Sequence, residues 1–257
     1  MISIKNDETM DAVGNGKVKV IQQKNGYRFS LDAILLSAFV EAKHSETILE
    51  IGVGSGVAIN IILSRFAFIK RAIGVEIQKE LADIATRNIA LNEFSDKTRI
   101  IHADINQYAS IFPRASFDVV FFNPPYRKCG SGKINPNQQK AIARHELKGN
   151  LKNFLEASSY LLGDGGRVYL VYPATRIAQL FVEMKKQNIE PKKVVMVHSR
   201  KSTPAKLILV SGIKSAKEGV NVAPPLFIYA EDIDDKYSVQ MDTIFSDYSF
   251  YPATFSE

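Results

Sequence analysis

The 257-residue sequence has a single cysteine, Cys129, and no tryptophan. One cysteine excludes a disulfide framework within the chain, and together with only four scattered histidines it does not give the spacing of a zinc site. The N-terminus lacks the apolar core of a secretion signal, and no apolar run approaches the roughly 18 residues needed to span a bilayer. These absences predict a cytoplasmic protein without a metal site or a membrane segment.

Basic side chains are concentrated in two parts of the sequence, although the net charge of the whole chain is only +6. Residues 127–152 and residues 185–206 each contain seven Lys or Arg side chains and one acid. Clustered cations displace condensed counterions from a phosphate backbone, so this pattern favours a nucleic acid as the partner. A solvated basic surface is the alternative interpretation.

Short apolar runs alternate with stretches of helical periodicity, which is typical of an α/β fold. The predicted strands cover residues 47–52, 72–77, 98–103, 117–122, 167–172, 194–198 and 206–213, and the predicted helices cover residues 57–65, 79–93, 151–162 and 175–187. The first five strands are continuous apolar runs, as in a parallel sheet buried on both faces, and the short link between the last two indicates an antiparallel hairpin. The sequence therefore predicts a Rossmann-like, seven-stranded mixed sheet with its last strand antiparallel and with helices on both faces.

A shorter unit precedes this core. Residues 18–23 and 27–29 flank Lys24-Asn25-Gly26, which is typical of a type I′ hairpin turn, and Ser30 is placed to cap a helix over residues 31–40. We expect this extension to pack over a ligand pocket as a lid. The predicted divisions are an N-terminal extension at residues 1–45, a core domain at residues 46–232 and a C-terminal tail at residues 233–257.

Several residues after the predicted strands indicate a nucleotide-like cofactor. A glycine-rich loop ends at Gly56, and glycine there permits a sharp turn and close approach of a ligand to the helix N-terminus that follows. Glu76 ends the second strand 20 residues later, where a carboxylate accepts hydrogen bonds from ribose hydroxyls. Asp104 ends the third strand and is interpreted either as a reader of an adenine amino group or as a helix N-cap. A nicotinamide enzyme would share the loop and the acid, so a further motif is needed.

That motif is Asn123-Pro124-Pro125-Tyr126, which follows the fourth predicted strand. If the Asn123 side-chain oxygen and the Pro124 carbonyl each accept one N–H of an exocyclic amine, the nitrogen lone pair is held toward an electrophile. Pro125 restricts the conformation of Pro124, and Tyr126 offers a flat face to a planar base. The tetrapeptide resembles the catalytic loop of amino-methyltransferases that modify adenine N6 or the glutamine amide. The resemblance implies the class I methyltransferase fold and S-adenosylmethionine as the cofactor.

A second resemblance concerns the acceptor. Residues 22–39, with Gly26-Tyr27-Arg28-Phe29-Ser30-Leu31-Asp32-Ala33, are similar to the N-terminal signature of the YfiC-like tRNA1(Val) adenine-N6 methyltransferases, and the similarity extends over about residues 18–232. Membership would imply direct methyl transfer to N6 of the adenosine next to the anticodon, adenine 37, with no strong base required. The residues expected to act are, for catalysis, Asn123, Pro124, Pro125 and Tyr126; for the cofactor, Glu50, Gly52, Gly54, Gly56, Glu76, Asp104 and Asn123; and for the tRNA anticodon loop, Tyr126, Arg127, Lys128, Arg144, Arg200 and Lys201.

Three other functions remain open from the sequence. A release-factor-type glutamine methyltransferase would share the tetrapeptide but usually carries a longer helical N-terminal domain. A ribosomal RNA or DNA adenine methyltransferase is the second alternative, and a cofactor-binding RNA chaperone is a non-enzymatic third. The sequence leaves the oligomeric state open, with a monomer as the simpler expectation.

Overall fold

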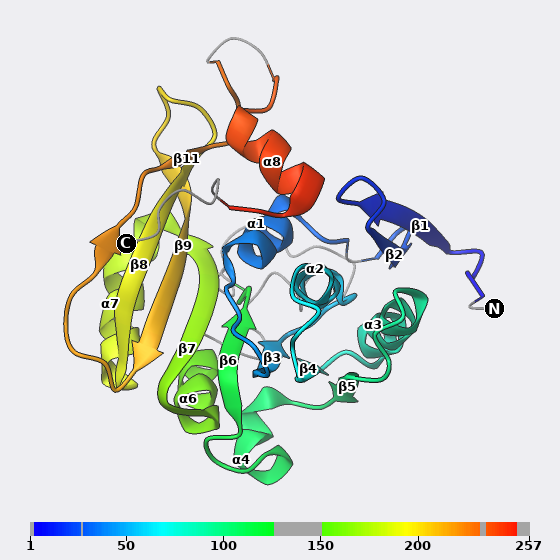
Figure 1. The fold of residues 1–257 in the computed structure, drawn as a ribbon, viewed down its shortest axis with the longest axis horizontal. Coiled ribbons are helices and arrows are strands. Elements are labelled where there is room, and N and C mark those ends of the chain that lie inside the picture. The colour runs from blue at the N-terminus through cyan, green and yellow to red at the C-terminus, as the bar shows by residue number, and fades with distance from the viewer. Residues whose placement is uncertain (1–2, 27, 126–150, 232–234, 251–257) are drawn as a thin grey trace.

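A computed structural model of the chain describes residues 3–26, 28–125, 151–231 and 235–250. A central sheet separates two helical layers, with α1, α2 and α3 on one face and α4, α6 and α7 on the other (Figure 1). The helices are α1 (Leu31–Phe39), α2 (Val57–Arg65), α3 (Lys79–Leu91), α4 (Tyr108–Ile111), α6 (Leu151–Leu161), α7 (Ile177–Lys186) and α8 (Val239–Asp247), with 3-10 turns η1 (Ile105–Gln107) and η2 (Ala174–Arg176). The strands of the sheet are β3 (Thr47–Ile51), β4 (Arg71–Glu76), β5 (Thr98–His102), β6 (Phe117–Phe122), β7 (Leu162–Pro173), β8 (Ile189–His198), β9 (Ala205–Lys214), β10 (Asn221–Val222) and β11 (Leu226–Phe227).

The strand order is β10-β8-β9-β7-β6-β3-β4-β5, with β11 also paired to β8. Only β9 among these described strands runs antiparallel to its neighbours, β7 and β8. The Rossmann-like fold class and the reversed strand of the β8–β9 hairpin are therefore confirmed. The predicted count of seven strands is too low, because β10 and β11 add two more to the edge at β8. Each is only two residues long, and so short a strand has no periodicity to detect.

The apolar runs of the central strands serve two cores at once. Along β6, Val119 and Phe121 pack into the layer of α1 and α2, while Val120 and Phe122 pack into the layer of α6. Successive side chains of a strand point to opposite faces, so the part of a strand that is covered on both sides must be apolar on both. This requirement is why the bounds of β6 match the predicted range.

The N-terminal hairpin lies elsewhere than predicted. β1 (Glu8–Val13) pairs antiparallel with β2 (Val18–Gln23), and the turn between them contains Gly14, Asn15 and Gly16, all with positive φ, at 60°, 54° and 86°. Glycine and asparagine adopt this left-handed conformation most readily, so this glycine-rich sequence forms the turn. The prediction of a turn at Lys24-Asn25-Gly26 was wrong, although β2 itself was predicted correctly.

The helix that follows the hairpin was predicted within one residue. Ser30 occupies its N-cap position with extended backbone, but its side chain makes no capping hydrogen bond, and Asp32 lies in the first turn as expected. Residues 34–39 of helix α1 are buried, and the helix lies among the sheet, α2 and α8 (Figure 1). No helix in the described part of the chain is both long and apolar enough to cross a membrane.

The segment expected to be a C-terminal tail contains α8, which packs onto the core. Met241 and Ile244 on this helix are fully buried, and the ring of Phe250 lies 5.5 Å from that of Phe39 on α1. Ser238 caps the helix by accepting a hydrogen bond from the Met241 amide at 3.2 Å. The described part of this segment is therefore integrated with the α1, α2 and α3 layer on one face of the sheet.

Candidate active site

The central parallel strands bring the predicted cofactor residues to one edge of the sheet. β3 lies between β6 and β4, and Ile51 is in register with both Phe122 and Val75. The residues that follow these strands, including Gly52 and Asn123, therefore meet at the carboxyl edge. This edge is where ligands bind in open α/β sheets.

The loop after β3 has a conformation that favours glycine at three positions. Gly52, Gly54 and Gly56 have φ values of 73°, 56° and 81°, which are in the left-handed region that other residues rarely adopt. Gly56 is also the N-cap of α2, and a Cβ there would lie 3.2 Å from the Cβ of Ala85 on α3. The glycines thus allow the loop to turn tightly and allow α2 to pack closely on α3.

Two buried carboxylic acids support this loop. Glu76 accepts hydrogen bonds from the Gly54 amide and the Gln78 amide, both at 2.9 Å, and Glu50 accepts one from the Ile59 amide at 3.0 Å. Burial raises the pKa of Glu76 above its ordinary value, against the effect of its backbone hydrogen bonds. Burial also raises the pKa of Glu50 well above its ordinary value, and the nearby Glu76 adds to this shift. Hydrogen-bond donors on a bound ligand would favour the ionised form of both acids.

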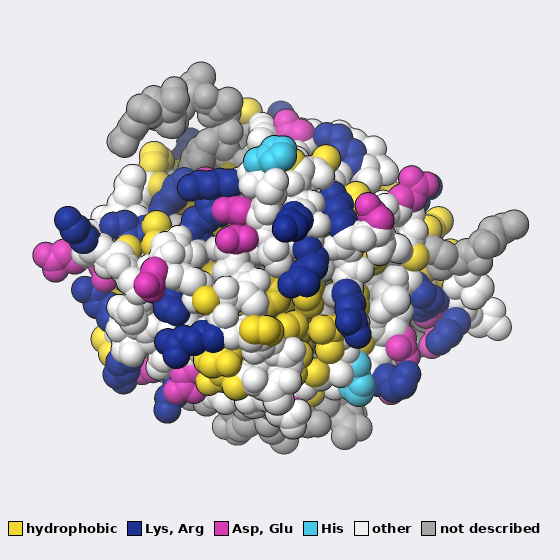
Figure 2. Space-filling model, turned by 60° about the horizontal axis from the view of Figure 1, so that its bottom comes forward, with side chains coloured by type: hydrophobic (Ala, Val, Ile, Leu, Met, Phe, Trp, Pro, Cys, Tyr) yellow, Lys and Arg dark blue, Asp and Glu magenta, His cyan; other side chains and the backbone are white. Residues whose placement is uncertain are grey.

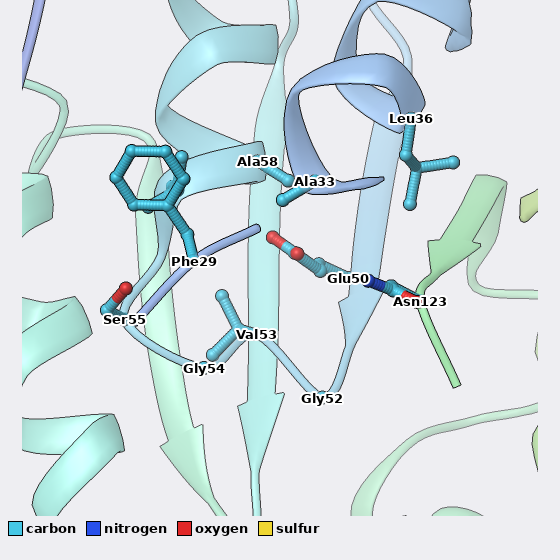
Figure 3. A pocket seen from close by; sticks show the side chains of 11 residues that line it. Phe29, Ala33, Leu36, Glu50, Gly52, Val53, Gly54, Ser55, Ala58 and Asn123 are labelled. Carbon is cyan, nitrogen blue, oxygen red and sulfur yellow. The ribbon is translucent and has the colours of Figure 1, made fainter. Parts of the chain in front are cut away.

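A pocket opens above the loop and is drawn in Figure 3. Phe29, Ala33 and Leu36 of the N-terminal extension line it together with Glu50 and Asn123. The remaining lining residues are Gly52, Val53, Gly54, Ser55, Val57 and Ala58. The sequence did not identify Phe29, Ala33 and Leu36 as lining residues, because their contribution depends on how α1 packs over the glycine loop.

Two polar atoms of this pocket have no hydrogen-bond partner among the described residues. They are the side-chain oxygens of Asn123 and Ser55, and both atoms are buried. A buried acceptor that lacks a donor costs about 1–3 kcal/mol, so such atoms are usually paired in the functional state. Both atoms are therefore available to donors of a bound molecule.

The remaining predicted catalytic residues lie at or beyond the end of the described segment. Pro124 is buried directly after Asn123, and Pro125 is partly buried. Tyr126 falls outside the described residues, as do Arg127, Lys128 and Arg144, so their roles stay predictions.

Asp104 has the capping role that was one of its two interpretations. Its carboxylate accepts a hydrogen bond from the Asn106 amide at 2.9 Å and caps η1. It does not belong to the described lining of the pocket, although it follows β5 at the same edge as Glu76. Its contact with the cofactor stays a prediction.

The second basic segment does not form one patch. β8 runs parallel to β7, so its end brings Arg200 and Lys201 to the carboxyl edge, whereas Lys185 and Lys186 end α7 at the opposite edge. On the face drawn in Figure 2, basic side chains lie dispersed among acids and apolar side chains. The basic side chains of residues 185–206 are therefore close together in the sequence but separated in the structure.

Arg200 itself is engaged within the protein. Its guanidinium donates to the Glu231 carbonyl at 2.8 Å and to the Asp235 carboxylate at 2.5 Å, and it lies 4.7 Å from the centre of the Tyr229 ring. Lys201 is exposed in the turn that follows. Three strand spacings separate β8 from β6, which places this turn about 14 Å along the edge from Asn123.

Comparison with known proteins identifies the family. Residues 48–135 match the model of a methyltransferase domain. A protein of Pedobacter heparinus named tRNA1(Val) (adenine(37)-N6)-methyltransferase is 30% identical over 180 residues, which cover 69% of this chain and 73% of that protein. The chain belongs to this methyltransferase family.

A second relative agrees with this membership, and a solved structure matches the fold. A protein of the same name from Porphyromonas gingivalis is 32% identical over 159 residues, which cover 60% of this chain and 61% of that protein. The crystal structure of a predicted O-methyltransferase from Agrobacterium tumefaciens matches the fold with a TM-score of 0.70 at 20% identity, over 86% of this chain and 98% of that chain. The methyl donor of this methyltransferase is S-adenosylmethionine.

The pocket fits this cofactor in its chemistry. The left-handed glycine loop leaves room for a ligand beside the backbone, and Phe29 and Leu36 line the pocket on opposite sides of Glu50 (Figure 3). Glu50, Ser55 and Asn123 place side-chain acceptors in the wall of the pocket, and Glu76 lies beneath the loop, where it accepts the Gly54 amide. The bound cofactor would supply a methyl group made electrophilic by its sulfonium charge.

Proposed function

We propose that this chain transfers the methyl group of S-adenosylmethionine to N6 of an adenosine in tRNA. The observation that carries the proposal is the Asn123 side-chain oxygen, which is buried, lacks a partner among the described residues and lines the pocket beside Glu50. The name shared by the relatives points to adenine 37 of tRNA1(Val) as the target.

The chemistry of an exocyclic amine explains why an asparagine is needed at this position. Conjugation with the ring delocalises the nitrogen lone pair, so the amine is a weak nucleophile. Asn123 accepts one N–H and the Pro124 carbonyl accepts the other, which directs the lone pair toward the methyl group and favours the developing charge on nitrogen. The proton leaves after the attack, so the site functions without a strong base.

The anticodon loop is the part of the tRNA that we place at the carboxyl edge. Its bases are unpaired, so turning an adenine into the pocket breaks no base pair. Tyr126 is proposed to stack on that base, and Arg127, Lys128, Arg144 and Lys201 to contact its phosphates. The N-terminal extension is proposed to act as a lid over the cofactor, supported by the place of Phe29 in the pocket wall. Such a substrate is met in the cytoplasm.

A labelling experiment tests the acceptor. The protein is incubated with methyl-labelled S-adenosylmethionine and separate pools of tRNA, ribosomal RNA, DNA and release factor, and labelled nucleosides are identified after digestion. We expect N6-methyladenosine in the tRNA pool. Label confined to protein would refute the proposal and favour the glutamine methyltransferase instead.

Substitution of Asn123 tests the mechanism. Asn123→Ala is expected to lower kcat by about 10²–10³-fold, the range found for removal of one transition-state acceptor or donor, while binding of S-adenosylhomocysteine changes little. Asn221→Ala on the exposed strand β10 is the matched control and should keep full activity. Unchanged turnover in Asn123→Ala would contradict the amine-clamping role.

A further inference from the structure

Two asparagines, Asn88 on α3 and Asn92 at its C-cap, bind the free edge of the N-terminal hairpin. The Asn92 side chain accepts a hydrogen bond from the Lys19 amide at 2.9 Å and donates to the Lys19 carbonyl at 2.8 Å. One helical turn earlier, Asn88 accepts from the Ile21 amide at 2.7 Å and donates to the Ile21 carbonyl at 2.9 Å. Lys19 and Ile21 are two residues apart on β2, so their backbone groups point to the same side. The two side-chain amides therefore take the place of a neighbouring strand beside β2.

Asn88 makes one additional contact that Asn92 lacks. Its second amide hydrogen goes to the carbonyl of Ser55 at 2.8 Å, between Gly54 and Gly56 of the cofactor loop. The corresponding hydrogen of Asn92 goes to the carbonyl of Asn88 within the same helix. Asn88 is completely buried, and both of its amide hydrogens are used. A single side chain thus joins the hairpin to the glycine loop.

The hairpin in turn holds the lid side of the pocket. Gln22 follows Ile21, and its side-chain oxygen accepts a hydrogen bond from the Phe29 amide at 3.0 Å. The Gln22 side-chain amide donates to the Asp11 carboxylate at 2.6 Å, which keeps the side chain oriented. Phe29 and Ser55 both line the pocket (Figure 3). A continuous series of contacts therefore runs from the loop through Asn88 and β2 to the lid.

We propose that Asn88 is a positioning residue that sets the cofactor loop relative to the N-terminal hairpin, and that the hairpin is thereby a working part of the cofactor pocket. The physical reason is the conformation of the loop. The Gly54 amide is held by the Glu76 carboxylate and the Gly56 amide by the Val53 carbonyl. The Ser55 carbonyl between them is held by the buried Asn88 amide, which comes from α3. With the loop and Phe29 held in place before binding, less conformational entropy is lost when the cofactor binds.

The matched pair Asn88→Ala and Asn92→Ala tests this proposal. Each variant removes the side-chain hydrogen bonds to one residue of β2, but only the first also releases Ser55. Binding of S-adenosylhomocysteine is measured by calorimetry, and thermal unfolding is measured without ligand. Asn88→Ala is expected to weaken binding by about tenfold or more and to raise KM for the cofactor with a smaller change in kcat, while Asn92→Ala keeps its affinity within about twofold. Equal affinity in the two variants would overturn the proposal.

A measurement on the unaltered protein covers the case in which the buried substitution prevents folding. Coupling between two sites is reciprocal, so S-adenosylhomocysteine must also stabilise the hairpin. Amide hydrogen exchange at Lys19 and Ile21 is expected to slow on ligand binding, although neither residue lines the pocket. Slower exchange confined to residues 52–56 would overturn the proposal. Neither measurement uses tRNA, so a negative result would overturn the role of Asn88 without affecting the proposal that tRNA is the acceptor. A negative result in the tRNA labelling experiment would likewise not affect the role of Asn88.

Discussion

Glu50 in the wall of the pocket and Glu76 beneath the glycine loop are both buried, and a buried carboxylate loses most of its hydration. Hydrogen bonds from backbone amides compensate part of the hydration that each carboxylate loses. Within the described part of the chain, neither carboxylate forms a hydrogen bond or an ion pair with a basic side chain. Burial accordingly raises the pKa of both groups. Both oxygens of Glu76 accept backbone amides, whereas Glu50 accepts one amide and lies in the pocket wall, so Glu50 is the acid that can accept further hydrogen bonds from a ligand.

This arrangement predicts a pH dependence of stability. Because the folded protein holds a proton on Glu50 above the ordinary pKa of 4.5, the free energy of unfolding falls as pH rises from that value through the folded pKa. Glu50→Gln keeps the acceptor for the Ile59 amide and removes the titration. Without cofactor, this variant is expected to lose less thermal stability than the parent between pH 5 and pH 8, by at least about 2–4 °C.

Thermal unfolding at several pH values, compared between parent and variant, checks this expectation. S-adenosylhomocysteine binding by Glu50→Gln should be weaker at the same time, because the acidic acceptor in the wall is lost. Identical pH profiles would show that Glu50 remains ionised in the folded protein.

At the scale of elements, the N-terminal hairpin and the residues after α8 pack against each other. Tyr248 and Phe250, after α8, belong to the same core cluster as Val13 and Val18 of the hairpin. A Cβ at Gly14 in the hairpin turn would collide with the ring of Tyr248. The residues after α8 therefore pack against the hairpin. Helix α8 itself packs against α1, which forms one wall of the pocket.

This packing predicts unequal effects of two substitutions on one helix. Ile244→Ala removes a fully buried side chain from the packing against the core and is expected to lower the free energy of unfolding by about 2–5 kcal/mol. Val239→Ala, at a position that is 81% exposed on the same helix, should change it by less than about 0.5 kcal/mol. Urea titration measures both values. Small and equal effects would mean that α8 does not pack onto α1.

For the whole molecule, the distribution of charge between the two edges of the sheet determines where a polyanion docks. Lys201 and Lys206 are exposed at the carboxyl edge, whereas Lys185 and Lys186 pair with Glu190 and Glu183 at the other. Screening limits the reach of exposed charges to about 8–10 Å at physiological salt. The edge that bears the pocket should therefore dominate tRNA binding.

Charge reversal at the two edges separates local binding from general attraction. Lys201→Glu is expected to raise the Kd for tRNA and to reduce the slope of log Kd against log salt by about 0.7–0.9 for each phosphate that the variant no longer neutralises. Lys186→Glu changes the net charge equally at the opposite edge and should leave Kd nearly unchanged. Filter binding over a range of salt concentrations provides both slopes. Equal weakening of binding by the two substitutions would indicate diffuse attraction without a defined docking edge.

Local signals in the sequence were enough to predict the sheet and the polar acceptor of the pocket. The apolar run at residues 119–122 identifies a strand buried on both faces, and Asn123 follows it directly. The glycine spacing after β3 likewise predicts a tight loop, because few other residues adopt the left-handed conformation found there. Such features depend on neighbours in sequence, and they are readable without knowledge of distant contacts.

Other features depend on contacts between distant parts of the chain. β2 pairs with β1, which precedes it across the Gly14–Gly16 turn. At the other edge of β2, the Ile21 amide donates to the side chain of Asn88, 67 residues away. The basic segment at residues 185–206 divides between two edges because β8 crosses the sheet within it. Lys185 and Lys186 precede this strand, and Arg200 and Lys201 follow it. An asparagine in a helix has no local mark that distinguishes a surface amide from one that joins two walls of a pocket. Hydrogen bonds and burial make that distinction, and both arise only when the chain has folded.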